Sequence, residues 1–94
     1  MTLLLKDPAA VLDYAIDWGA DYLGDGDLIS QSDWSVDPEE PGGIAVVSND
    51  FDDAISSVQA GGGIAGRLYR LSNRVVTQAG RTDERSIVLR VEKR

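Results

Sequence analysis

The chain contains no cysteine and no histidine, and these two absences exclude several kinds of chemistry. Without cysteine there is no disulfide framework, no thiolate nucleophile and no cysteine-ligated metal. Without histidine, the usual general base near neutral pH and the commonest transition-metal ligand are also missing. A small extracellular domain stabilised by bridges is disfavoured for the same reason. We therefore expect a protein that is not an enzyme.

Long hydrophobic runs are absent too. No segment approaches the roughly 18–20 apolar residues that a membrane-spanning helix needs. The start of the chain is apolar for only three residues and lacks a basic segment, so we expect no signal peptide. The 94 residues have the length of one domain with a core that needs neither metal nor disulfide. These features predict a protein made in a cytoplasm, with no membrane partner.

Basic residues are scarce in the first half of the chain, and acidic residues are scarce in the second. Residues 1–53 hold 13 acids and one base, residues 54–94 hold 3 acids and 8 bases, and the net charge is −7. In an antiparallel sandwich, acidic and basic strands can pair across the ladder. The alternative is a surface that is negative on one side and positive on the other, which suits head-to-tail stacking or a charged partner. Nucleic acid is not expected, because no clean basic stripe is present.

The clearest pattern is a strand, a tight turn and a second strand over residues 66–91. Large or apolar residues alternate with polar ones in both strands, which predicts an antiparallel hairpin with one solvent-exposed face. Arg70, Ser72 and Arg74 fall on the polar face. Tyr69 at the start of the first strand resembles a tyrosine corner, whose hydroxyl bonds a nearby backbone group. Asn73 falls on the inner face, where its amide must find partners.

The rest of the chain predicts more strands, separated by turns rich in glycine, proline and acids. An irregular lead-in over residues 1–10 is expected, and Asp7 and Pro8 favour a short helical turn there. A helix over residues 8–23 competes with a strand over 12–18, and the even spacing of large residues favours the strand. Further strands are expected at residues 28–36, 44–48 and 54–60, with a loop at 37–43, a turn at 49–53 and a glycine connection at 61–63.

These elements predict an all-β, immunoglobulin-like antiparallel sandwich of six or seven strands, formed by residues 1–94 as a single domain. The residues on the apolar faces are its expected core. They are Tyr14, Ile16, Trp18, Trp34, Tyr69, Leu71, Val75, Ile87, Leu89 and Val91.

No motif in the chain carries a recognisable chemistry. Asp25, Asp27, Asp50, Asp52 and Asp53 are possible calcium ligands, but no bidentate glutamate follows at the EF-hand spacing, and turn-forming aspartates explain them better. With 16 acids, chance carboxylate pairs are inevitable and do not predict a glycosidase. The glycine-rich run at 61–66 lacks the Lys-Ser/Thr of a P-loop. We expect no metal, no cofactor and no catalytic residue.

Surface arginines are the candidate interface. Arg70, Arg74 and Arg90 lie along the hairpin, and Tyr22 lies near a turn. Arginine serves equally well in cross-strand pairs within a molecule and in bidentate contacts with a partner, so both interpretations stay open. Trp18, Trp34 and Tyr22 offer an aromatic platform for sugars, although core packing is the simpler role for the two tryptophans.

Two stretches of the chain also resemble a known family. The first includes Lys6-Asp7-Pro8, Leu12-Asp13-Tyr14, Ile16-Asp17-Trp18 and Trp34, and the second includes Gly61-Gly62, Gly66, Tyr69, Asn73, Gly80-Arg81 and Glu84-Arg85. Their order resembles the fibre–tail adaptor, or head–tail neck, proteins of tailed phages and prophages, whereas residues 37–60 match poorly. The resemblance implies an immunoglobulin-like virion component made in the bacterial cytoplasm. It would work in multiple copies and contact other tail proteins or itself.

A second function stays open from the residues alone. A bacterial immunoglobulin-like module that recognises a glycan or surface polymer would share this strand pattern. It predicts an exposed aromatic row or a calcium-stabilised loop.

Overall fold

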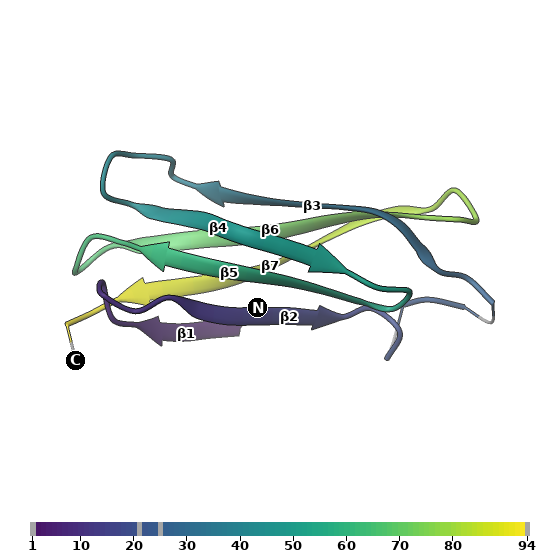
Figure 1. The fold of residues 1–94 in the computed structure, drawn as a ribbon, viewed down its shortest axis with the longest axis horizontal. Helices are drawn as coiled ribbons and strands as arrows, with labels where there is room; N and C mark the ends of the chain where they lie inside the picture. The colour runs from purple at the N-terminus through teal and green to yellow at the C-terminus, as the bar shows by residue number, and fades with distance from the viewer. Residues whose placement is uncertain (1, 21, 25, 94) are drawn as a thin grey trace.

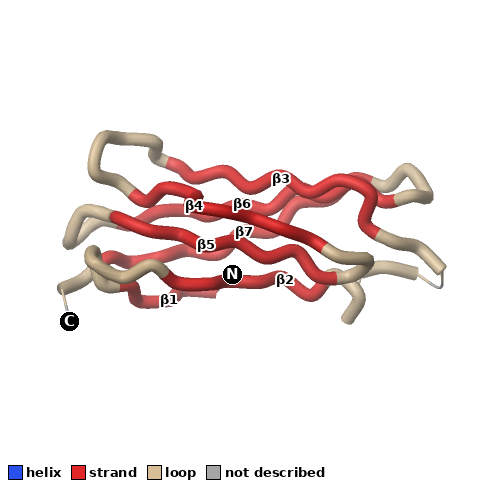
Figure 2. The backbone as a smooth tube through the Cα atoms, viewed as in Figure 1, coloured by secondary structure: helices blue, strands red, loops and turns tan. Residues whose placement is uncertain are grey.

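In a computed structural model, the described residues 2–20, 22–24 and 26–93 form seven strands and no helix (Figures 1 and 2). The prediction of an all-β sandwich is confirmed. None of the described residues forms a helix long and apolar enough to cross a membrane. The strands are β1 (Thr2–Lys6), β2 (Leu12–Asp17), β3 (Ile29–Asp37), β4 (Ile44–Phe51), β5 (Ile55–Gly62), β6 (Leu68–Thr77) and β7 (Thr82–Val91).

The strands form two sheets, seen one behind the other in Figure 1. One sheet has the order β1-β7-β6-β3 and the other has the order β2-β5-β4. All pairs are antiparallel except β1 with β7, which is parallel. This is the arrangement of an immunoglobulin-type sandwich in which the first strand has joined the sheet of the last. The molecule is elongated, with extents of 43 × 20 × 17 Å.

The hairpin predicted over residues 66–91 is present as β6 and β7. Tyr69 lies opposite Leu89, and Leu71 lies opposite Ile87. Every second residue of β6 from Tyr69 to Thr77 is buried, and Arg70 and Arg74 between them are exposed. The regular alternation therefore predicted both the pairing and the face that meets the core.

The prediction of an irregular lead-in over residues 1–10 is wrong. Thr2–Lys6 forms β1, which pairs with Ile87–Val91. No helical turn follows: Asp7–Ala10 makes a turn in which the Ala9 N–H donates to the Asp7 carboxylate at 2.8 Å, and β2 begins at Leu12. Three consecutive leucines show no alternation, so the pattern that reveals a half-buried strand was missing here.

The boundaries predicted around residues 44–63 are also wrong. β4 continues through Asn49 and Asp50 to Phe51, and the turn is confined to residues 52–54. Gly61 and Gly62 belong to β5, opposite Ala45 and Ile44, and are not part of a connection. β4 is an edge strand with a register shift between Val46 and Ser48, and such exposed edges tolerate polar residues and bulges that a central strand would not.

The core lies between the two sheets. Its largest fully buried side chains include Trp18, Tyr69, Leu71 and Leu89. Of the residues expected in the core, Tyr14 and Trp34 are half-buried and pack against it. The full set of buried hydrophobic residues is Ile16, Trp18, Ile29, Val36, Ile44, Val58, Ala60, Tyr69, Leu71, Val75, Ile87, Leu89 and Val91.

Candidate interaction surfaces

A buried asparagine joins the two sheets. The Trp18 indole N–H, just after β2, donates to the Asn73 side-chain oxygen on β6 at 2.8 Å. The Asn73 amide donates in turn to the Ser32 hydroxyl at 2.9 Å and to the Asp33 carbonyl at 3.1 Å. Asn73 is fully buried, so these bonds supply the partners that an inner-face amide requires.

The same network continues to the second tryptophan. The Ser32 and Ser56 hydroxyls lie 2.6 Å apart, and the Trp34 indole N–H donates to Ser56 at 2.9 Å. Ser32 and Trp34 belong to β3, whereas Ser56 belongs to β5 of the other sheet. The network therefore joins the two sheets through three hydrogen bonds and fixes their relative position. It also uses both indole N–H groups within the protein.

A buried lysine closes one end of the sandwich. Lys6, the last residue of β1, is fully buried, and its ammonium donates to the Gly62 carbonyl at 2.6 Å and to the Asp7 carbonyl at 2.9 Å. Burial lowers the pKa of Lys6, and the Asp7 carboxylate partly offsets this. β1 is thereby tied to β5 in the other sheet. Sequence reasoning missed this role, because a lysine at the end of an apolar run looks like a solvated residue.

The opposite end is held by Arg81 in the β6–β7 turn. Its guanidinium donates to the Asp27 carboxylate at 2.9 and 3.3 Å and lies 4.6 Å from the centre of the Tyr22 ring. Burial alone would raise the pKa of Asp27, but hydrogen bonds from Arg81, Ala79, Thr77 and Leu28 hold it below its usual value. Tyr22, expected at an interface, is half-buried between Arg81 and Trp18, and the Tyr22 and Trp18 rings make a T-shaped contact with centroids 5.2 Å apart.

Tyr69 bonds the connection that precedes it, as a tyrosine corner does. Its hydroxyl accepts the Ile64 N–H at 3.1 Å and donates to the Glu40 carboxylate at 2.7 Å. Arg67 also lies 3.4 Å from that carboxylate. Burial raises the pKa of Tyr69, and the bond to Glu40 raises it further.

We expect Tyr69→Phe to lower the free energy of unfolding by about 1–2 kcal/mol at pH 8, because it removes a bond to a charged acceptor and leaves the Ile64 N–H unpaired. The folded pKa of Tyr69 lies above its ordinary value of 10.0, so the stability that the hydroxyl contributes is present below pH 10 and is lost at higher pH. The difference in free energy of unfolding between the wild type and Tyr69→Phe, measured by urea unfolding, should therefore be larger at pH 8 than at pH 11. An equal difference at both pH values would contradict the stabilising role of the Tyr69 hydroxyl.

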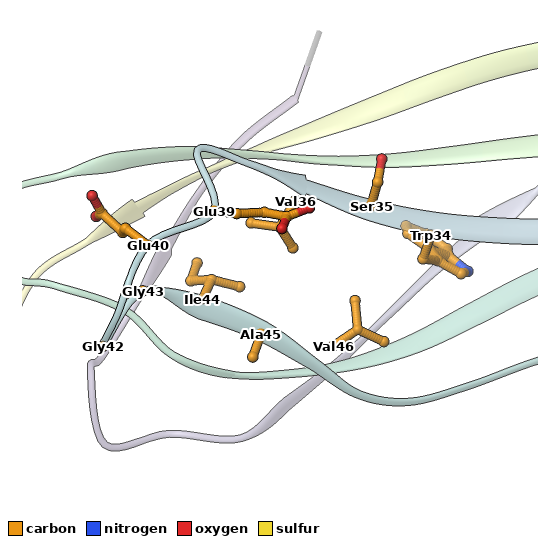
Figure 3. Close-up of a pocket in the computed structure, with 10 residues that line it drawn as sticks. All are labelled: Trp34, Ser35, Val36, Glu39, Glu40, Gly42, Gly43, Ile44, Ala45 and Val46. Carbon is orange, nitrogen blue, oxygen red and sulfur yellow. The ribbon is translucent and has the colours of Figure 1, made fainter.

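A groove of about 580 Å³ lies between β3 and β4. Figure 3 shows that Trp34, Val36, Ile44 and Val46 point toward the space between the two strands. Glu39 and Glu40, on the loop between β3 and β4, also line it. The groove therefore has apolar side chains along its two strands and acidic groups at the end formed by the loop.

The arginines expected at an interface lie on the outer face of the β1-β7-β6-β3 sheet. Arg70 lies opposite Asp37, and Arg74 lies between Asp33 and Glu84. Arg90 pairs with Glu92 at 2.7 Å. Arg70 and Arg74 are exposed, and neither forms an ion pair with another residue of the described part of the chain.

The outer face of the other sheet differs in charge. Strands β2, β4 and β5 contain no lysine or arginine. Asp13, Asp17 and Asp50 are exposed on them. The face that carries the arginines also carries Asp33, Asp37 and Glu84, so acidic and basic residues lie side by side across its ladder, which is the first of the two charge arrangements considered from the sequence. The outer face of the other sheet is acidic.

The acidic turns bond their own backbone. The Asp52 carboxylate accepts the N–H groups of Ala54 and Ile55 at 2.9 and 2.8 Å, and these bonds lower its pKa. Asp50 likewise accepts the Phe51 N–H at 2.8 Å. Asp25 lies outside the described residues. Among those described, no three acids gather closely enough to hold a metal ion.

Comparison with known proteins supplies the family. A scan against models of protein families matches residues 6–90 to the family described as podophage GP4 fiber-tail adaptor protein gp77. The chain belongs to this family. The match begins at the buried Lys6, the last residue of β1, and ends at Arg90, one residue before the end of β7, so it spans both sheets of the sandwich. A search of curated proteins gave no match. The resemblance inferred from the sequence is confirmed, and membership of the fiber-tail adaptor family identifies a structural component of a phage tail.

Proposed function

We propose that the protein is a non-enzymatic adaptor that works in multiple copies and joins parts of a phage tail through protein–protein contacts. The family match over residues 6–90 carries this proposal. An adaptor needs a scaffold that keeps its shape and at least two surfaces that different neighbours can occupy. The chain offers both.

Rigidity comes from the bonds between the sheets. The Trp18–Asn73–Ser32–Ser56–Trp34 network ties them together at the centre, Lys6 does so near one end, and Arg81 holds the loop at the other. Buried polar groups that are fully satisfied favour one arrangement over all others.

The two outer faces supply the surfaces. Arg70 and Arg74 on one outer face lie beside Asp33, Asp37 and Glu84 but form no ion pair with them, so their guanidinium groups can pair with Asp13 and Asp17 on the other face of a neighbouring copy. Because the faces are different, such a contact is heterologous, and repeated contacts of this kind close into a ring when the rotation allows.

Deletion of the gene from the phage tests the adaptor role. We expect tails that assemble without fibres and recover them when the purified protein is added. Quantitative mass spectrometry of intact virions should give several copies per tail. Normal fibre content and infectivity in the deletion phage would contradict the adaptor role, and one copy per tail would contradict the multiple-copy arrangement.

We expect Arg70→Gln with Arg74→Gln to leave folding nearly unchanged, since exposed charges contribute at most about 1 kcal/mol. Incorporation of the protein into tails should fall by about tenfold, because the charges that steer the contact are lost. The measurements are thermal unfolding and the copy number in virions. Lys93→Gln removes one exposed charge outside the strands and serves as the control. Loss of folding would instead show that the arginines act within their own molecule.

A further inference from the structure

The first strand forms an edge of the sandwich that has none of the usual barriers to strand pairing. β1 stands first in the order β1-β7-β6-β3, along the lower margin of the molecule in Figure 2, and no described strand covers its outer side. Native edge strands are protected by exposed charges, prolines or bulges. The other edges follow this rule, because β2, β3 and β4 carry exposed aspartates, and β3 and β4 also have register shifts. β1 has a continuous register, and its one charged residue, Lys6, is buried.

β1 exposes apolar side chains on both of its faces. Leu4 lies opposite the buried Leu89 and therefore faces inward, whereas Leu3 and Leu5 face outward. Leu3, Leu4 and Leu5 are 60%, 37% and 45% exposed, respectively. A strand placed beside β1 would remove apolar surface from water on both faces of the sheet.

The backbone of β1 can also accept a second neighbour. The Glu92 N–H donates to the Lys6 carbonyl at 2.9 Å, so Lys6, and Leu4 two residues before it, turn their backbone groups toward β7. In a parallel ladder, the residues between them turn theirs the other way. The N–H and C=O groups of Leu3 and Leu5 therefore point to the free side of β1, where no described strand pairs with them.

Hydrophobicity and charge together select the partner strand. The edges formed by β2, β3 and β4 of a second copy, and by the segment Thr82–Ser86 of its β7, would bring acidic side chains against the leucines. Covering a carboxylate with apolar surface is costly. β1 of a second copy avoids this cost, because it has no acid and is apolar on both faces. Antiparallel pairing centred on Leu4 sets Leu4 opposite its own counterpart and Leu3 opposite Leu5.

We propose that two copies of this protein pair edge to edge through β1, antiparallel and about a two-fold axis between their Leu4 residues, so that two four-stranded sheets become one of eight strands. Leu3 of each copy would exchange two backbone hydrogen bonds with Leu5 of the other. The contact is isologous, because the same residues meet from both sides. It goes beyond the proposed adaptor role and differs from the contact between outer faces, since the purified protein can show it without a tail.

The basic residues near the β1–β1 junction do not oppose it. The Lys6 ammonium faces inward and is fully buried. Arg85, which lies over the Trp18 ring, and Arg90, which pairs with Glu92, are on β7, one strand behind β1. The β1 strand of the second copy therefore meets no charged side chain directly.

The acids of β2 make the dimer dependent on salt. Leu4 lines a cavity of about 330 Å³ together with Tyr14–Ile16, so β2 lies beside β1 at the level of Leu4. A two-fold axis at Leu4 brings Asp13 of one copy toward Asp17 of the other, and these exposed carboxylates repel each other. Salt screens this repulsion, so the β1 dimer should strengthen as salt rises, whereas a contact between arginines and aspartates should weaken.

Disulfide trapping tests the junction directly, because the chain has no cysteine of its own. Leu4→Cys should form a disulfide-linked dimer under mild oxidation, since residues opposite each other at a position without ladder hydrogen bonds have Cα atoms about 4.5 Å apart, which a disulfide can span. Val47→Cys is the matched control, because Val47 is 58% exposed on the edge strand β4. It should cross-link at least about tenfold more slowly. Equal rates for the two variants would overturn the proposal.

A mixture of Leu3→Cys and Leu5→Cys tests the register. The proposed pairing sets these two positions opposite each other, so oxidation should give more of the mixed dimer than of the two like dimers together. Random encounter would give equal amounts of mixed and like dimers, and that result rejects the register.

Sedimentation equilibrium measures the association without cross-links. Each β1 contributes five residues, so the contact is smaller than the roughly 1,200 Å² at the low end of specific interfaces, and we expect a Kd on the order of 100 µM. Leu3→Lys should leave thermal unfolding unchanged and raise the Kd at least about tenfold, because an edge lysine blocks strand pairing. Val47→Lys, on β4, should leave the Kd unchanged.

Three results would reject the β1 dimer. They are a protein that stays monomeric up to about 1 mM, well above the expected Kd, a dimer that Leu3→Lys leaves intact, and a dimer that dissociates as salt rises. Fibre loss in the deletion phage is scored separately, so the adaptor role and this dimer fail independently.

Discussion

We expect Asn73→Leu to lower the free energy of unfolding by about 3–4 kcal/mol. Leucine has the same branched arrangement of four side-chain heavy atoms as asparagine but no polar atoms, so it fills the position and cannot accept the Trp18 indole N–H. It also leaves the Asp33 carbonyl without the Asn73 amide. Each buried polar group left without a partner costs about 1–3 kcal/mol. The loss should be visible as an earlier urea midpoint followed by tryptophan fluorescence.

Asn49→Leu is the matched control, because Asn49 is exposed on the edge strand β4. Its effect should stay within about 0.5 kcal/mol, as for most surface substitutions. If both variants unfold at the same urea concentration, the central network does not hold the sheets together.

We expect Gly62→Ala to lower the free energy of unfolding by about 3 kcal/mol, the second large effect. Gly62 has φ of +75°, a conformation that costs other residues about 1–2 kcal/mol. A methyl group there would also come within 2.7 Å of the Gly43 carbonyl oxygen on the backbone that leads into β4. A flexible side chain could move aside, but backbone cannot, so the pairing of Ile44 with Gly62 would open.

Gly66→Ala measures the conformational cost alone. Gly66 has φ of +88°, and a methyl group there would meet nothing within 4 Å. We expect this variant to lower the free energy of unfolding by about 1 kcal/mol. In thermal and urea unfolding, Gly62→Ala should therefore be the less stable of the two variants. If both variants lose the same free energy of unfolding, the backbone at Gly43 moves enough to accommodate the added methyl group.

Alternation explains which parts of the fold could be predicted. β2, β3, β6 and β7 each have one buried and one solvent-exposed face, so apolar and polar side chains alternate along them. Their inner residues, such as Ile16 and Leu71, can therefore be identified from every second position. β1 has three leucines in succession, and β4, the exposed edge strand of its sheet, ends in polar residues. In neither case does the pattern of a half-buried strand appear. Their positions follow from β7 and β5, which only the tertiary structure supplies.

The candidate surfaces were predictable only as residue types. The arginines of the hairpin and the acids of the first half are evident from composition, and the alternation of β6 places Arg70 and Arg74 on one face. The partners of Asn73 and Lys6 were not predictable, since Ser32, Trp18 and Gly62 lie far from them in the chain. The register of β1 against β7 was hidden for a similar reason, because register between distant strands leaves no local signal.

The parallel pairing of β1 with β7 has a mechanical consequence. The chain enters the sheet at Thr2, opposite Ile87, and leaves it at Val91, opposite Lys6. Pulling these two points apart slides the strands along each other, so the hydrogen bonds between them are loaded together in shear. An antiparallel pair pulled from one end would instead open one bond at a time. A tension applied across the two ends of this sandwich therefore meets its greatest resistance at the five-residue seam between its first and last strands.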